Sequence, residues 1–127
     1  MDATLPFAYW TVLVAAVLPY VWVGFAKAQP GYDNAAPRAF LARAEGWRGR
    51  AHSAQLNAWE AFAPYAAAVI IAVTRGAPVG TVNVLCGAFL VFRLLHGLAY
   101  IADQGTARSV IWALGFGCVV GLFAVAA

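Results

Sequence analysis

Four long runs of apolar residues decide what this chain can fold into. They cover residues 5–26, about 51–74, 79–102 and 107–127. Each run supplies the about 20 residues that a helix needs to cross the hydrocarbon core of a membrane. The runs are continuously apolar rather than alternating, which disfavours a membrane β-barrel. We predict an all-α integral membrane protein whose single domain, residues 1–127, is an up-down bundle of four transmembrane helices.

Composition excludes the main alternatives. The chain is 64% hydrophobic and 10% charged, whereas average soluble chains have roughly 45–50% apolar and about 25% charged residues, so a water-soluble globule is disfavoured. The net charge is +3, but the basic residues gather in one connecting segment, which argues against a nucleic-acid surface. Cys86 and Cys118 stand singly in apolar runs without metal-ligand spacing, so we expect no metal site.

The connecting segments predict the orientation in the membrane. With four spans, the long first connection, residues 27–50, lies on the same side as the third connection. The opposite side carries only Arg75. Because basic residues favour the cytoplasmic side, we expect a cytoplasmic 27–50 loop and both termini outside. The basic residues on the predicted cytoplasmic side are Lys27, Arg38, Arg43, Arg48, Arg50 and Arg108.

Polar side chains interrupt the second and third spans at matching depths. Asn57 and Glu60 lie a turn or two from the basic side, and Arg93, His96 and Tyr100 lie about 5 to 15 Å below it. Spacings of three and four residues place the members of each set on one helix face. Ionisable groups at this depth cost several kcal/mol unless they are paired or hydrated, so by default they mark a functional site. The polar layer, as we call this group, comprises Arg50, Asn57, Glu60, Arg93, His96, Tyr100 and Arg108.

The polar layer stays net positive even with Glu60 counted, which suits an anion that also carries an ammonium group. Purely structural explanations are also open. Glu60 and Arg93 could form an interhelical ion pair that sets the helix register, and His96 could be a hydrogen-bonded core histidine. Tyr100 could belong to an interfacial aromatic belt.

The sequence resembles the MAPEG family, the membrane-associated proteins in eicosanoid and glutathione metabolism. The resemblance is carried by "RAHSAQLNAWEAFAPY" and "FRLLHGLAYIADQGTARSV", which extends it from about Arg50 to the end of the chain. Its elements are N-x-x-E-x-x-x-P at Asn57, Glu60 and Pro64, R-x-x-H-x-x-x-Y at Arg93, His96 and Tyr100, and the pair Arg108 and Ser109.

The resemblance implies a homotrimer with glutathione as co-substrate, bound between neighbouring subunits and open to the cytosolic side. Arg108 and Ser109 would face the glutathione sulfur. An alanine-rich chain without visible eukaryotic targeting suggests a member from the bacterial inner membrane. The residues that would hold glutathione are Arg50, Asn57, Glu60, Arg93, His96 and Tyr100.

The expected activity is a glutathione-dependent transferase or peroxidase that attacks hydrophobic electrophiles from the bilayer. A free thiol has a pKa of about 8.5, and a fixed guanidinium at a helix N-terminus lowers it. Two alternatives stay open. One is a non-catalytic, lipid-binding family member, because Ser53 stands where many members carry an arginine. The other is a small proton-coupled exporter driven by protonation of Glu60.

Overall fold

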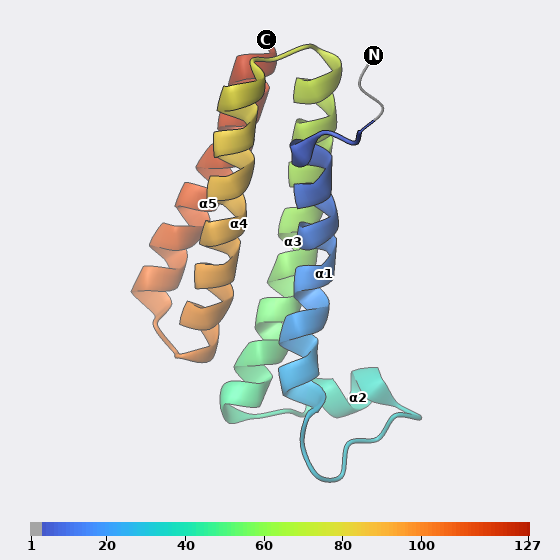
Figure 1. Ribbon diagram of the computed structural model, residues 1–127. Coiled ribbons are helices and arrows are strands. Elements are labelled where there is room, and N and C mark those ends of the chain that lie inside the picture. Colours follow the sequence, from blue (N-terminus) through green and yellow to red (C-terminus); the bar gives the residue numbers. More distant parts are fainter. Residues whose placement is uncertain (1–3) are drawn as a thin grey trace.

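The computed structural model describes residues 4–127 and, within that range, contains helices and no strands. Four of its five helices are long and apolar enough to cross a membrane, which confirms the predicted four-helix fold. The helices are α1 (Phe7–Lys27), α2 (Pro37–Ala42), α3 (Gly46–Thr74), α4 (Val79–Ile101) and α5 (Gly105–Ala126) (Figure 1).

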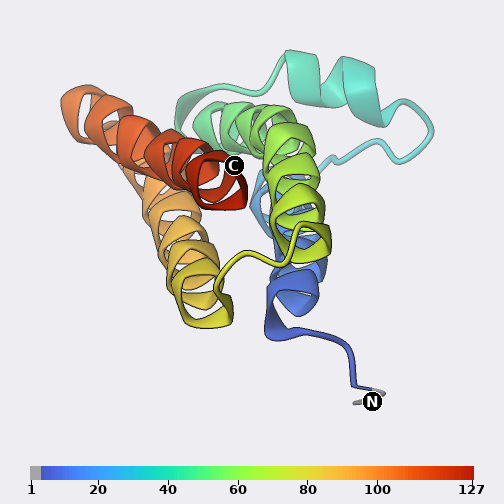
Figure 2. The same ribbon diagram turned by 90° about the horizontal axis from the view of Figure 1, so that it is seen from above.

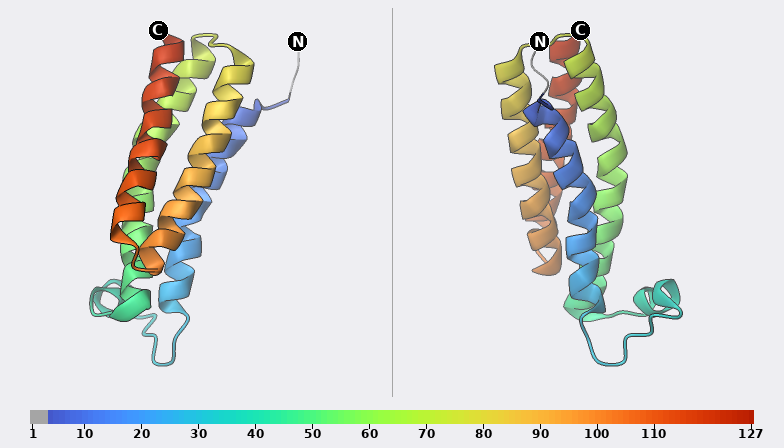
Figure 3. Two further views of the ribbon diagram at one scale, coloured as in Figure 1. Left: turned by 90° about the vertical axis from the view of Figure 1, so that its left-hand side faces the viewer. Right: turned by 45° about the vertical axis from the view of Figure 1, so that its right-hand side comes forward.

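The long helices alternate in direction and form two close sets. Helix α1 packs along α3, and α5 packs along α4. Helices α3 and α4 hold the two sets together, since each of them contacts all three other long helices (Figure 2). The start of α1, the α3–α4 turn and the C-terminus lie at one end of the bundle. Helix α2 and the α4–α5 turn lie at the other end, which we call the basic end (Figures 1 and 3).

The structure corrects the predicted 27–50 connection at two points. Helix α3 begins at Gly46, and the connection contains the short helix α2, which begins with Pro37. Hydropathy reports the length of apolar sequence and not the length of helix. The 29 residues of α3 make a rod of about 43 Å, longer than the ~30 Å hydrocarbon core. Arg50 therefore lies on a polar extension of this helix rather than in a loop.

Aromatic and hydroxyl groups hold the middle of the bundle together away from the basic end. The rings of Tyr65 and Phe89 stack in parallel at 3.7 Å between centroids, joining α3 to α4. The Tyr65 hydroxyl shares a hydrogen bond with the Thr11 hydroxyl, which also donates to the carbonyl of Ala8. These contacts satisfy buried hydroxyl groups that would be costly to leave unpaired in an apolar interior.

Helix α1 contacts α4 where the Trp22 indole lies against Gly97. Trp22 is 2% exposed, and a Cβ atom added at Gly97 would overlap the Cζ2 and Cε2 atoms of its ring. The absence of a side chain at position 97 is therefore what lets the two helices meet.

We expect Gly97→Ala to destabilise the protein, because its methyl group would force the indole or the helix aside. Overpacking of this kind costs about 1–3 kcal/mol. Thermal unfolding in detergent should show a lower Tm than for the wild type. Gly87→Ala is the matched control on the same helix, since a methyl group there meets nothing within 4 Å. Equal Tm values for the two variants would contradict the close packing.

Candidate functional site

Three adjoining pockets lie between α3 and α5, with α4 as their floor. The outer pocket, of about 150 Å³, is lined by Arg50, Ala99, Tyr100, Asp103, Gln104, Gly105 and Arg108. The polar pocket, of about 240 Å³, is lined by Asn57, His96, Tyr100, Arg108, Ser109 and Trp112. The apolar pocket, of about 140 Å³, is lined by Asn57, Glu60, Ala61, Pro64, Phe89, Arg93, Trp112, Phe116 and Val119.

Shared side chains join the pockets into one groove. Tyr100 and Arg108 line both the outer and the polar pocket. Asn57 and Trp112 line both the polar and the apolar pocket. The groove thus begins near the α4–α5 turn and ends among apolar side chains about halfway along α5. Every residue of the predicted polar layer lines some part of it.

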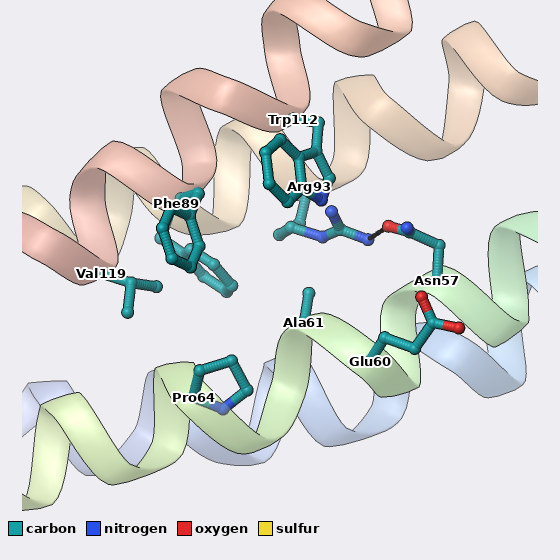
Figure 4. A pocket seen from close by; sticks show the side chains of 9 residues that line it. Asn57, Glu60, Ala61, Pro64, Phe89, Arg93, Trp112 and Val119 are labelled. Carbon is teal, nitrogen blue, oxygen red and sulfur yellow. Dashed lines mark hydrogen bonds between the residues drawn. The ribbon is translucent and has the colours of Figure 1, made fainter.

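Arg93 is buried in the wall of the apolar pocket, next to Asn57, which also lines the polar pocket. Its side chain is 4% exposed, and its Nη2 atom donates a 2.7 Å hydrogen bond to Oδ1 of Asn57 (Figure 4). Within residues 4–127 no ion pair joins Arg93 to Glu60, so the interhelical ion pair considered as a structural explanation is wrong. The amide of Asn57 supplies the hydrogen bond to the buried guanidinium, and the Glu60 carboxylate attracts the same charge without direct contact.

Glu60 lies on the exposed wall of the apolar pocket, one turn after Asn57 on α3 (Figure 4). In the part of the chain that the structure describes, its carboxylate has no hydrogen-bond or ion-pair partner. A carboxylate in this position is costly in an apolar medium unless a cation reaches it. Glu60 is therefore the group of the groove best suited to a ligand ammonium.

In the polar pocket, His96 and Arg108 each contact the Tyr100 ring. The ring edge of His96 meets the Tyr100 ring at 5.8 Å between centroids. The Arg108 guanidinium lies over the Tyr100 ring, 4.3 Å from its centroid, a cation–π contact. The buried Nδ1 atom of His96 has no hydrogen-bond partner among the described residues, so this nitrogen does not show the bonding expected of a structural core histidine.

Two predicted residues lie toward the basic end of the groove. The Nε atom of Arg50 donates a 2.9 Å hydrogen bond to the carbonyl of Ile101, the last residue of α4. Its guanidinium therefore ties α3 to α4 and satisfies a carbonyl that the helix itself leaves free. Ser109 is exposed and lies beside Arg108 in the polar pocket.

Sequence reasoning missed the apolar residues of the groove. Phe89, Phe116 and Val119 look like any other apolar residue of a membrane helix, so nothing in the sequence separated them from those that face lipid. Trp112 could have been found, because it follows Arg108 by four residues and so shares its helix face. Its indole lies parallel to the Phe116 ring, with 5.4 Å between the ring centroids.

The groove combines two kinds of surface. Guanidinium groups at its basic end and middle favour an anionic ligand, and Glu60 adds one site for a cation. The apolar pocket beyond them has the size of a cavity that holds a single benzene ring.

Comparison with known proteins agrees with the resemblance found in the sequence. Residues 7–127 match the MAPEG family, which covers nearly the whole chain. No curated protein and no solved structure matches the chain. The family includes glutathione transferases and related proteins. With four helices that can span a membrane and a family match over almost its full length, this integral membrane protein belongs to the MAPEG family.

Proposed function

We propose that this protein is a glutathione-dependent transferase or peroxidase that activates the glutathione thiolate against hydrophobic electrophiles from the bilayer. The observation that carries the proposal is the Arg108 guanidinium, which lies over the Tyr100 ring in a pocket that continues into an apolar cavity. A fixed cation and an adjoining apolar space are what a thiolate and a lipid-soluble electrophile require.

The charges of glutathione suit the order of side chains along the groove. The tripeptide has two carboxylates, one ammonium group and a thiol. Its ammonium group would meet Glu60 at the inner end, and one carboxylate would take up the donors of Arg93 that Asn57 leaves free. The other carboxylate would lie in the outer pocket near Arg50. The remaining proposed contacts are Asn57, His96 and Tyr100, which line the polar pocket between these ends.

Arg108 and Ser109 would face the sulfur in the middle of the peptide. A guanidinium near a thiol favours the charged form and lowers the thiol pKa. Arg108 lies in the first turn of α5, where the helix dipole adds in the same direction. The Ser109 hydroxyl can donate a hydrogen bond to the thiolate. In the transferase reaction the thiol would lose its proton to water, and the sulfur would form a bond to an electrophilic carbon that approaches from the apolar side. In a substitution the leaving group would depart with the electron pair of its bond to that carbon. In an addition the π electrons of the double bond would move to the neighbouring atom, which then takes up a proton.

We further propose that the protein forms a homotrimer in the bacterial inner membrane, with the basic end in the cytoplasm. Large apolar side chains are exposed on all four long helices and must meet lipid or another copy of the chain. Glu60 is exposed on the single subunit, so a neighbouring subunit could complete the wall of the groove there. The basic side chains of the 27–50 connection support the placement of the basic end in the cytoplasm.

Removal of the Arg108 guanidinium tests the proposed activity directly. Mixing the purified protein with glutathione should generate the ultraviolet absorbance of a thiolate at neutral pH. Arg108→Ala should raise the pKa of the bound thiol by about one unit and so lower the thiolate-to-thiol ratio about tenfold, because the nearby positive charge is lost. Arg38→Ala removes an exposed arginine of α2 and should leave the absorbance unchanged. Absence of thiolate in the wild type, together with no conjugation of any standard electrophile, would refute the proposed activity.

Substitutions of Asn57 and Glu60 on α3 should affect stability and ligand binding differently. Asn57→Ala should lower the free energy of unfolding by about 2 kcal/mol, because it leaves the buried Arg93 guanidinium unpaired, and should also weaken glutathione binding. Glu60→Gln should weaken binding with little loss of stability, since the Glu60 carboxylate has no hydrogen-bond or direct ion-pair partner within residues 4–127. Thermal unfolding and equilibrium binding of glutathione measure the two effects. A large loss of stability in Glu60→Gln would contradict this division.

A further inference from the structure

Trp22 connects α1 to the groove, although α1 carries no residue of the polar layer. Its indole is almost completely buried and forms a cluster with Ala54 and Ala58 of α3. These alanines are four residues apart and so lie one above the other on the same helix face. Their small side chains leave the space that the indole fills.

The same indole limits how close α4 can come. A Cβ atom at Gly97 would overlap two ring carbons and lie 2.8 Å from Nε1 of Trp22. Gly97 follows His96 directly and precedes Tyr100 by three residues, which places Tyr100 one turn further along the same helix. The position of Trp22 thus determines where this turn of α4 lies relative to α3.

Tyr100 is held between this cluster and Arg108. Its side chain packs against the cluster formed by Trp22, Ala54 and Ala58, and the Arg108 guanidinium lies over its ring. Within the described residues the Arg108 side chain has no hydrogen bond or ion pair. Contact with the Tyr100 ring is therefore what holds the Arg108 guanidinium in its position in the polar pocket.

We infer that Trp22 is a positioning residue of the proposed thiolate site, which it serves by fixing the Tyr100 ring on which the Arg108 guanidinium rests. The inference rests on the proposed function, because the guanidinium matters only if it faces a thiolate. Trp22 itself touches neither glutathione nor the electrophile. A smaller side chain would let the ring tilt toward α1, and the cation would spend less time beside the sulfur.

The test is a pH titration of thiolate absorbance for glutathione bound to the full-length protein. Trp22→Leu should raise the apparent pKa of the bound thiol by about half a unit, a fall of about threefold in the thiolate-to-thiol ratio. Trp22→Phe keeps a ring and should titrate closer to the wild type. Trp10→Leu makes the same change at an exposed position of α1 and should titrate as the wild type does.

A double-mutant cycle separates positioning from general loosening of the fold. In an Arg108→Ala background, Trp22→Leu should cause no additional rise, because no guanidinium remains to be displaced. An equal rise in both backgrounds, or a Trp22→Leu titration that matches Trp10→Leu, would overturn the inference. If Trp22→Leu does not fold, the cycle is run with Trp22→Met, which also removes the ring, and judged by the same outcomes. Absence of thiolate in the wild type would instead refute the proposed function, on which the inference depends.

Discussion

Burial of the Arg93 charge inside an apolar bundle is the constraint on which the groove depends. A guanidinium at this depth needs hydrogen-bond acceptors, and the amide of Asn57 supplies one across the α3–α4 contact. That bond fixes the relative depth of two helices that approach from opposite directions. The side chains one and two turns closer to the basic end, including His96 and Tyr100, then line the same groove as Asn57. Because Arg93 bonds to the Asn57 amide, the oxygen atoms of Glu60 keep their hydrogen-bonding capacity for a ligand.

The fold follows from the sequence because lipid removes most of the alternatives. Backbone groups in hydrocarbon must bond within their own helix, so apolar length alone sets the number of spans. The ends of the helices do not follow in the same way. Helix α3 continues through the polar residues before Ala51, where hydropathy falls but nothing breaks the helix. The short helix α2 is likewise hidden, because six residues are too few to show a hydrophobic period.

The sequence predicts which polar side chains line the groove, but not its apolar side chains. The depth and face of Asn57 and His96 follow from helix geometry, which is why they line one pocket. The partner of Arg93 did not follow, since both Asn57 and Glu60 were within reach and only packing decides between them. Trp22 lay beyond prediction for a different reason. Its proposed positioning role depends on close packing against Gly97. The sequence of an apolar helix does not indicate whether a tryptophan faces lipid or a neighbouring helix.

The groove begins beside the polar end of the bundle and ends among aromatic side chains in its middle. Its two ends would therefore face different solvents, one aqueous and one hydrocarbon. Under the proposed function, the protein would work as a phase-transfer catalyst, in which a water-soluble reagent and an oil-soluble reagent meet without either leaving its own medium. The adduct would carry the charges of the peptide and would no longer dissolve in the lipid, so partitioning alone would drive its departure toward water.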